Sequence, residues 1–431
     1  MKKLFLFFLL SISLVRIPAQ PALTKAEAIR LATDSSCTVA MADNVIKTAE
    51  AKFKQTDAVF LPQVTLDYSG LMTNNPLHAF GFKLLQRGIA QNDFAPDLLN
   101  HPNATGNFTT EATVVQPIFN ADMLSMREAA RKQVAIAGYQ KQRVQDYLKF
   151  SAETEYNQLQ LSYEMLKVSK EALATLQAIY KWTKDRYDQG YIQRSDLLNV
   201  DVNVKSIETQ IAAAQSAIQE HSDNLSVLMR KPVGAIYQVD SLIPDGNLSN
   251  YNHLPADRSD FKAMEMAISS YDDMIKSTRR SLVPKVNGFA SYQLNDSRAL
   301  GFGNGAYLVG VQMTWHVFKG NEVHNKLATQ RLEQKQIALQ LQDSKEQDAK
   351  ALAKANSQLT EANYRLAQYH LSVQQAQEAL QILENRYKQG LVSTTDLLQA
   401  QTQQAMQKLY YKQAVTMHNS TLAYIRFLTA R

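Results

Sequence analysis

Cysteine is almost absent from this sequence, because Cys37 is the only one among 431 residues. A single cysteine cannot form a disulfide within the chain, and it lacks the paired spacing that zinc sites use. The sequence therefore excludes a disulfide-stabilised domain and a cysteine-based zinc fold. His316 and His324 lie eight residues apart, and this pair does not favour a metal site. We expect neither a metal nor a cofactor.

Long apolar runs are also missing beyond the first residues, so we expect no transmembrane helix. The chain begins with Lys2 and Lys3, continues with an apolar stretch over 4–15, and then has small residues. This order is typical of a secretory signal peptide over residues 1–20, cleaved around 19–22. The alternative is an uncleaved anchor. Membrane strands remain open, since a strand needs only about ten alternating residues.

Neither sign of charge predominates. Lys and Arg number 46 and Asp and Glu number 40, which gives a formal net charge of +6. Three of the cationic residues lie in the signal segment, and the rest are interspersed with acids. Nucleic-acid binding needs a concentrated basic face, so we expect no nucleic-acid partner.

Helix breakers are scarce in two long tracts, where the only glycines are Gly138, Gly190 and Gly390. No proline lies between Pro117 and Pro232, and none follows Gly320. The tracts are rich in Ala, Gln, Leu, Lys and Glu, which favour helices. Residues 121–188 alone would form a helix of about 68 residues, roughly 100 Å long. That length suits a rod or the stave of a tube rather than a compact domain.

The second tract carries an unbroken heptad pattern. Its positions are Leu352, Ala355, Leu359, Ala362, Leu366, Tyr369, Val373, Ala376, Leu380, Leu383 and Tyr387. Matching positions lie 200 residues earlier, at Leu159, Leu166, Leu173, Leu176, Tyr180 and Tyr187. Polar residues such as Thr183 weaken this first seam. The many small and polar members predict thin helical walls packed side by side.

One phrase occurs twice, 200 residues apart: "RYDQGYIQRSDLLN" from Arg186 and "RYKQGLVSTTDLLQ" from Arg386. Each interrupts a long helical tract. Gly190 and Gly390 suit the left-handed residue that ends a helix. Each phrase therefore predicts a tip, meaning a tight turn between two antiparallel helices.

The start of the helix after each tip is predicted from short polar residues. Ser195 and Thr395 are expected to be N-caps, and Asp196 and Asp396 to be acids favoured by the new helix dipole. Capping alone does not explain why both tips share the Arg-Tyr-x-Gln-Gly sequence.

Four segments alternate apolar and polar residues with a period of two, over 60–70, 106–119, 282–292 and 306–318. In the third segment Phe289 breaks the polar face. With aromatic residues near the ends, this pattern is typical of outer-membrane strands. A soluble hairpin with one wet face would also produce it, and the pattern alone does not decide. The loop of the first hairpin is 23 residues longer than that of the second, as suits an external loop.

The chain thus divides into a first repeat over 21–230, a linker over 231–258 and a second repeat over 259–431. Each repeat has a helix (Lys25 to about Val59; Ser259 to about Arg280), a hairpin, a long helix, a tip and another long helix. Four strands cannot close a membrane barrel, which needs at least eight. If these strands lie in the membrane, the barrel must be shared between chains, and three chains would give twelve strands. The expected fold is then mainly α, in which a long antiparallel α-helical barrel continues a transmembrane β-barrel shared by three protomers.

At this point the sequence resembles the TolC-type outer membrane efflux proteins, the outer membrane factor family. The resemblance covers essentially the whole mature chain. It rests on "LTKAEAIRLA", "RSDFKAMEMAISS" with "LVPKV", "VVQPIFN" and both tip phrases, taken in this order and spacing.

The resemblance implies a homotrimeric, passive exit duct in the outer membrane that extends into the periplasm. The duct would contact outer-membrane lipid and serve a tripartite efflux or type I secretion system. Its implied partners are a periplasmic membrane-fusion adaptor and an inner-membrane pump of the RND or ABC type. No enzymatic activity is implied.

The resemblance also implies roles for residues at the tips. The adaptor-docking residues would be Gly190, Tyr191, Ile192, Asp196, Gly390, Leu391, Val392 and Asp396. The aperture and lumen would involve Asp396 and Tyr387, with Arg194 as a further candidate. Two positions depart from the family pattern. Val392 replaces a basic gating residue, and Gln399 replaces a second acid one turn after Asp396.

Two other classes remain as alternatives. A periplasmic coiled-coil adaptor or scaffold would share the heptads, but it would not need four alternating strands. An exported enzyme would need a nucleophile with a nearby base, and no such arrangement stands out. "GFGNG" from Gly301 lacks the Lys-Ser/Thr and the helix of a phosphate loop, so we interpret it as a hairpin turn.

Overall fold

The structure is a computed structural model that describes residues 22–246 and 253–430. The predicted signal peptide lies outside the described residues. The chain forms two compact units, and each takes segments from both halves of the sequence. The helical unit comprises residues 22–41, 141–246, 253–258 and 346–430, and the sheet unit comprises 42–140 and 259–345. The repeat boundaries inferred from the sequence stay a prediction.

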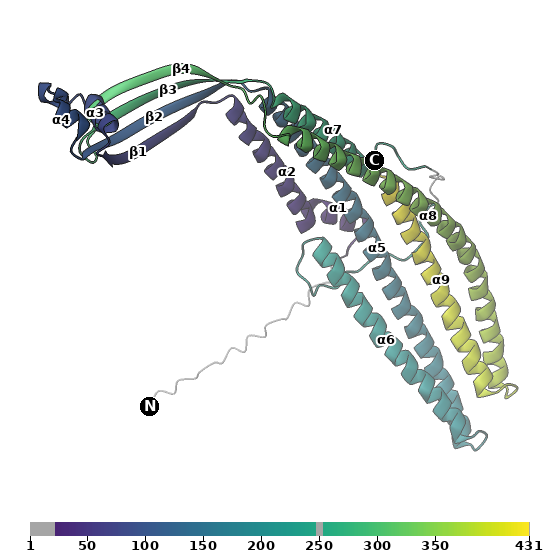
Figure 1. The fold of residues 1–431 in the computed structure, drawn as a ribbon. Coiled ribbons are helices and arrows are strands. Elements are labelled where there is room, and N and C mark those ends of the chain that lie inside the picture. Colours follow the sequence, from purple (N-terminus) through teal and green to yellow (C-terminus); the bar gives the residue numbers. More distant parts are fainter. Residues whose placement is uncertain (1–21, 247–252, 431) are drawn as a thin grey trace, which may run out of the picture. The chain divides into compact units, whose positions relative to one another are not determined.

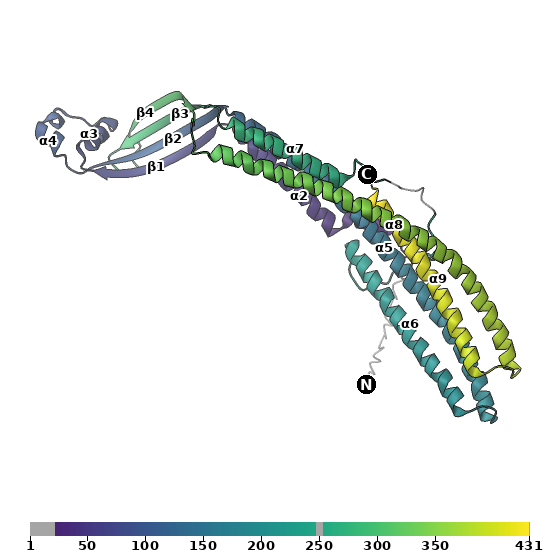
Figure 2. The same ribbon diagram turned by 45° about the vertical axis from the view of Figure 1, so that its right-hand side comes forward.

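Two antiparallel helix pairs dominate the helical unit (Figures 1 and 2). Helix α5 (Ala121–Asp188) turns into α6 (Arg194–Leu228), and α8 (Glu322–Lys388) turns into α9 (Thr394–Leu428). The helix expected over 121–188 is confirmed with these bounds. The first parts of α5 and α8 belong to the sheet unit.

The heptad seam of α8 lies on a packed side of that helix, since all eleven of its residues are buried or half-buried. Leu352 and Ala355 pack with Ile425 and Leu428 of α9. Burying these faces between helices removes apolar surface from water, which is the main driving force for the packing. In the first seam Tyr187 is the exception, because it remains exposed.

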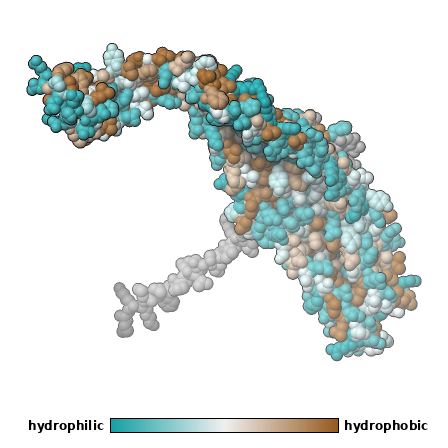
Figure 3. Space-filling view, viewed as in Figure 1, coloured by the Kyte–Doolittle hydropathy of each residue, from teal (hydrophilic) through white to brown (hydrophobic). Residues whose placement is uncertain are grey.

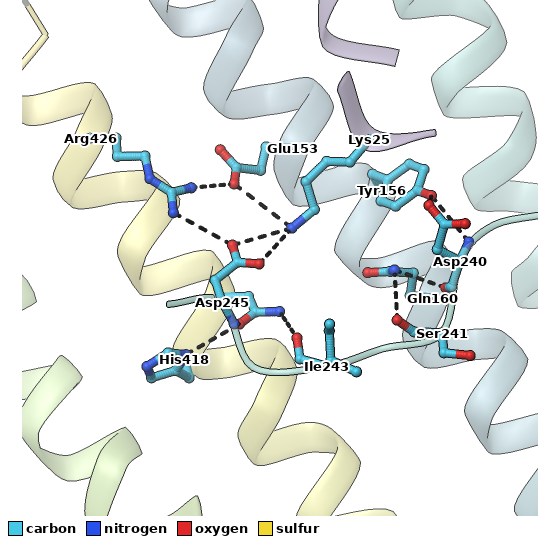
Figure 4. A network of polar contacts seen from close by, with 11 residues as sticks. Lys25, Glu153, Tyr156, Gln160, Asp240, Ser241, Ile243, Asp245, His418 and Arg426 are labelled. Atoms are coloured by element: carbon cyan, nitrogen blue, oxygen red, sulfur yellow. Dashed lines mark hydrogen bonds and ion pairs between the residues drawn. The ribbon is translucent and has the colours of Figure 1, made fainter. Parts of the chain in front are cut away.

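The segment after α6 lies along the helical unit and is fixed by a buried tyrosine (Figure 4). The Tyr156 hydroxyl donates to the Leu23 carbonyl at 2.9 Å and accepts from the Asp240 amide at 3.2 Å. Burial raises the pKa of Tyr156 to about 12, so the hydroxyl keeps its proton and its role as donor. Tyr156 belongs to a core cluster that includes Leu225 and Tyr237.

Four charged residues in the same region form a network with alternating signs (Figure 4). Lys25 pairs with Asp245 at 3.2 Å and Arg426 pairs with it at 3.6 Å, while both cations also pair with Glu153. The Asn419 side-chain oxygen accepts from the Asp245 amide at 2.8 Å. Because each carboxylate contacts both cations, the network ties the linker to α5, α9 and helix α1 (Lys25–Ser35).

The first helix expected, from Lys25 to Val59, is not continuous. It consists of α1, α2 (Cys37–Gln55) and the short η1 (Thr56–Val59). The prediction was wrong at Ser36, whose backbone is extended with ψ of 142°. The Ser36 hydroxyl accepts from the Thr38 amide at 3.1 Å. Serine competes for backbone donors in this way and favours a new helix start.

Helix α7 (Ser259–Arg280) has the bounds expected from the sequence and packs on the first part of α5. Asp273 of α7 is buried and contacts Lys132 of α5 at 2.6 Å and Lys276 at 3.2 Å. Burial by itself raises the pKa of this carboxyl, but the hydrogen bonds from the two lysines hold it below its ordinary value. The ion pair between Asp273 and Lys132 therefore holds α7 against the first part of α5 within the sheet unit.

Asp273→Asn is expected to lower the thermal unfolding midpoint near neutral pH, by about 2–4 °C for each kcal/mol lost. A carboxyl with a depressed native pKa stabilises above its unfolded value of 3.8 and loses that contribution as pH falls through the native pKa. The difference in unfolding midpoint between the variant and the parent protein should therefore be largest near pH 7 and should shrink below pH 3.8. Scanning calorimetry at pH 7 and pH 3 measures it. An equal difference at both values would contradict this role.

The four predicted strands are present as one antiparallel sheet in the order β1-β2-β3-β4. Their bounds are β1 (Gln63–Thr73), β2 (Thr105–Phe119), β3 (Lys285–Asp296) and β4 (Asn304–Thr314). The fourth strand ends at Thr314 rather than at Phe318. Thr314 pairs with Lys285, the first residue of β3, so later residues have no partner on that strand.

The pairing register separates the sheet into two chemically different faces. Directly paired residues share a face. The apolar face includes Val64, Leu66, Tyr68, Met72, Val114, Tyr292, Tyr307, Val309, Val311 and Met313. The polar face includes Thr65, Asp67, Ser69, Asn107, Thr109, Glu111, Thr113, Asn287, Ser291, Gln293, Asn295 and Gln312. All ten of these apolar side chains are exposed, which leaves apolar surface without cover in one chain. Figure 3 shows apolar residues among hydrophilic ones along the sheet.

The presence of Phe289, an aromatic residue, on the polar face has a local cause. It pairs with Gly310 on the polar face, and a Cβ at Gly310 would lie 2.9 Å from the Phe289 ring. The ring therefore occupies the space that a side chain at position 310 would need. Gly70 is covered by Phe108 in the same manner on the apolar face.

The long loop between β1 and β2 contains helices that the sequence did not predict, namely α3 (Pro76–Leu85), η2 (Gln91–Phe94) and α4 (Pro96–Asn100). The side-chain Nε2 of Gln86 donates to Asn107 Oδ1 at 2.8 Å and to the Gly106 carbonyl at 2.7 Å. Asn107 in turn donates to Asn295 Oδ1 at 2.8 Å. Because Asn107 and Asn295 lie on the polar face, the loop is fastened to that face of the sheet.

Within residues 22–246 and 253–430, no helix offers an apolar stretch long enough to cross a membrane.

Candidate functional site at the helix tips

The first tip closes α5 with a hydrogen-bonded glycine turn. Gly190 has φ of 78°, the left-handed value that glycine adopts without steric cost. The Gly190 amide donates to the Tyr187 carbonyl and the Tyr191 amide to the Arg186 carbonyl, each at 2.9 Å. These two bonds define a Schellman motif, which satisfies the last carbonyls of a helix.

The second tip closes α8 with the same geometry. Gly390 has φ of 76°. Its amide donates to the Tyr387 carbonyl at 2.9 Å, and the Leu391 amide donates to the Arg386 carbonyl at 3.0 Å. The expectation that both glycines end their helices in the left-handed conformation is confirmed.

The helix after each tip starts with an aspartate that reaches back three residues. In the second tip Asp396 Oδ2 accepts from the Ser393 amide at 3.2 Å, and the Ser393 hydroxyl accepts from the Asp396 amide at 3.1 Å. In the first tip Asp196 Oδ2 accepts from the Gln193 amide at 3.3 Å. The second tip thus has a full capping box.

The predicted N-caps Ser195 and Thr395 were wrong by two residues. The caps are Gln193 and Ser393. An acid in a capping box stands three positions after the cap, so the aspartates fix the helix starts earlier than the prediction placed them. Asp196 and Asp396 keep their predicted place in the first turn.

Tyr387 is the centre of a polar cluster that joins the two tips. Its hydroxyl lies 3.0 Å from Thr183 Oγ1 and 3.1 Å from Thr394 Oγ1. The Arg186 guanidinium donates to the Tyr387 carbonyl at 2.6 Å. The Cζ atom of Arg186 lies 4.7 Å from the centre of the Tyr387 ring. We call Thr183, Arg186, Tyr387 and Thr394 the Tyr387 cluster. It connects α5, α8 and α9 at the end of the helical unit.

Burial makes this cluster costly to break. Tyr387 is 1% exposed and Thr183 is completely buried. A buried hydroxyl that loses its only partner costs about 1–3 kcal/mol. An apolar cluster that includes Leu380, Leu397 and Leu398 packs around it.

The remaining predicted tip residues differ in exposure. Tyr191 and Leu391 are largely exposed, whereas Ile192 and Val392 are half-buried. Val392 packs against the apolar cluster around Tyr387. Asp396 is exposed. The structure therefore brings Tyr387 into the core of the tips and leaves Tyr191, Leu391 and Asp396 at the surface.

Arg194, the further aperture candidate, is exposed as the first residue of α6. In the part of the chain that the structure describes, its guanidinium has neither a hydrogen bond nor an ion pair, and it does not join the Tyr387 cluster. Gln399 is also exposed.

Three residues of the Tyr387 cluster were not among the predicted site residues. Arg186 was the first residue of the repeated phrase, and this was a usable signal. Thr183 interrupted the first heptad seam, and a polar residue at a seam position can indicate a buried hydrogen bond. Thr394 carried no signal that distinguished it from the neighbouring capping residues.

The described residues contain no group of three or more His, Cys, Asp or Glu side chains that could hold a metal ion.

The model of a family described as outer membrane efflux protein matches residues 28–229 and 250–428. The match covers most of the chain, and the chain belongs to this family. Its members are transport conduits of the outer membrane rather than enzymes, and the chain is accordingly an outer-membrane protein with a periplasmic extension. No curated protein matches the sequence.

Solved outer-membrane channels share the fold. The CmeC outer membrane channel of Campylobacter jejuni has a TM-score of 0.77 at 14% identity, covering 94% of this chain and 85% of that chain. The outer membrane protein VceC of Vibrio cholerae has a TM-score of 0.76 at 17% identity, covering 94% and 95%. A membrane protein from Pseudomonas aeruginosa has a TM-score of 0.80 at 13% identity, covering 95% and 91%. At these identities the likeness establishes the fold.

Proposed function

We propose that three copies of this chain assemble into a passive exit duct across the outer membrane. The observation that carries the proposal is the four-stranded sheet, which has an apolar exposed face, a polar face, and outer edges at β1 and β4. The apolar face would contact lipid and the polar face would line the channel.

The open sheet edges favour a closed assembly. Among the described residues, β1 pairs only with β2, and β4 pairs only with β3. An unpaired edge within lipid leaves backbone donors and acceptors unsatisfied, at several kcal/mol per group. If β4 of one chain pairs with β1 of the next, three chains form a barrel of about twelve strands, above the minimum of eight.

The helix pairs would continue the duct into the periplasm. Two pairs per chain give six in a trimer, and their tips would form the periplasmic end. Docking of a membrane-fusion adaptor at the tips is supported by the exposed Tyr191 and Leu391. The pump would be an inner-membrane protein of the RND or ABC type, within an efflux or type I secretion system. The family match favours this function over a periplasmic adaptor or scaffold.

Reconstitution into a planar lipid bilayer tests the duct. We expect discrete conductance steps from the detergent-purified protein, because a closed barrel with a polar interior conducts ions. Protein that inserts into liposomes yet leaves the bilayer silent over a wide voltage range would contradict a continuous duct.

Asp396→Asn is expected to reduce block of this conductance by a trivalent cation such as hexamminecobalt. Three copies of Asp396 near a constriction would bind a multivalent cation. Loss of all three carboxylates should raise the half-blocking concentration by about tenfold or more, equivalent to 1.4 kcal/mol. Bilayer recordings at increasing blocker concentration measure this value.

Asp196→Asn is the matched control, since Asp196 also accepts from a backbone amide at the start of its helix. Its substitution should leave the block unchanged. If both variants lose block equally, the effect comes from helix capping. If the Asp396→Asn variant is blocked as strongly as the parent protein, Asp396 does not line the pore.

A further inference from the structure

We infer that the contact between the two tips of one chain is repeated between neighbouring chains, with Arg386 donating to the Tyr187 carbonyl of the next copy. This inference rests on the proposed trimer and names its seam. The partner is a second copy of this chain. The surfaces are the free flank of the second helix pair and the free flank of the first.

The template is the contact already present within the chain. Arg186 of the first tip donates to the Tyr387 carbonyl of the second tip. Farther along the same boundary, Glu171 and Glu164 of α5 pair with Lys408 and Lys412 of α9, at 2.9 and 3.2 Å. One side of the first helix pair is therefore covered by the second pair.

On the first helix pair, the counterparts of the buried tip residues are exposed. Tyr187 occupies the position 200 residues before Tyr387, with the same Schellman geometry. Its side chain is 37% exposed, whereas that of Tyr387 is 1% exposed. Leu198 on α6 is 52% exposed, whereas its counterpart Leu398 on α9 is 7% exposed. Tyr187 and Leu198 thus resemble interface residues that lack a neighbour.

The donor side is also free. Among the described residues, the side chain of Arg386 has no hydrogen bond or ion pair, although Arg186 has both a carbonyl acceptor and a tyrosine ring. The residue that follows the tyrosine acceptor is basic in the second tip and acidic in the first, which favours an arginine donor at the first. Arg186 lies near the carbonyl of Lys388, and the counterpart of Lys388 is Asp188. Arg386 would therefore meet an acid rather than a second cation.

On the α8 side, the seam between chains would be apolar at the positions where α5 carries acids in the seam within a chain. The positions 200 residues after Glu164 and Glu171 are Tyr364 and Leu371, and both are exposed on α8. The position 200 residues after Trp182 is Ile382, which is also exposed. Exposed apolar residues at this spacing on one flank of a helix indicate a contact surface.

Site-specific photocrosslinking of the full-length, detergent-extracted protein tests the seam. Benzoylphenylalanine placed at Tyr187 should link two chains, giving products of two and three chain masses on a denaturing gel. The same group at Tyr387 is the matched control and should link only within its own chain, to peptides of α5 or α9. Arg386→Ala should reduce the two-chain product from position 187 several-fold and leave the product from position 387 unchanged.

Light scattering on the same samples separates the failure of the seam from the failure of the duct. If the labelled protein is a trimer but position 187 gives no two-chain product, and benzoylphenylalanine at Leu198 gives none either, the seam is wrong and the duct stands. If the protein is a monomer, the proposed function fails as well. A two-chain product from position 387 equal to that from position 187 would also overturn the inference, because the two tips would then not differ.

Discussion

Val309→Arg should remove nearly all assembled protein from the outer-membrane fraction. Val309 lies at the middle of β4 on the apolar face and is 69% exposed. An arginine on the lipid face of a membrane strand costs about 2–4 kcal/mol near the bilayer midplane. A trimer carries that cost three times, which is comparable to the whole stability of a typical domain. The readout is heat-modifiable, SDS-resistant trimer in isolated outer membranes.

Leu308→Arg is the matched control for this prediction. Leu308 is the adjacent residue of the same strand and is 61% exposed, but it lies on the polar face. An arginine there would face the aqueous channel, so trimer should form, and the added positive charge should shift the selectivity of the conductance toward anions. Equal loss of trimer from both variants would show that β4 does not separate lipid from water.

Tyr387→Phe should loosen the helix tips and raise the conductance. The change keeps the ring and removes only the hydroxyl, which leaves Thr183 and Thr394 buried without their partner. Each unsatisfied hydroxyl costs about 1–3 kcal/mol. Local opening should therefore become roughly tenfold more frequent or more. Hydrogen exchange of the tip amides and single-channel recordings measure the two effects.

Tyr187→Phe is the corresponding control, because the Tyr187 hydroxyl has no hydrogen bond within the part of the chain described here and its side chain is exposed. We expect exchange and conductance like those of the parent protein. The seam proposed above uses the carbonyl of Tyr187, so this control does not disturb it. Unchanged exchange in Tyr387→Phe would contradict a stabilising role for the cluster.

The elements of the fold could be predicted well from the sequence where a long pattern determined them. Alternation over ten residues determined the two faces of the strands. The missing prolines, with Gly138 as the one glycine inside α5, determined the bounds of that helix. The break at Ser36 was not predictable in the same way, since one serine hydroxyl decides it. The helices within 74–104 were missed because short helices in a loop depend on contacts such as that of Gln86 with Asn107.

The candidate site could be predicted only in part, because the repeated phrase describes local structure and the site depends on contacts between the tips. Gly190 and Gly390 were predictable, since a left-handed turn requires glycine. The difference between Tyr187 and Tyr387 was not, although their sequence contexts are nearly the same. That difference arises from which neighbour each tyrosine has in one chain.

The central claim is that the duct exists only as an assembly of three chains. Multi-angle light scattering of the detergent-solubilised protein, with the mass of bound detergent subtracted, tests it most directly. We predict a protein mass three times that of one chain, with no stable monomer when detergent is removed. A monomer that stays soluble and folded without detergent would contradict the account.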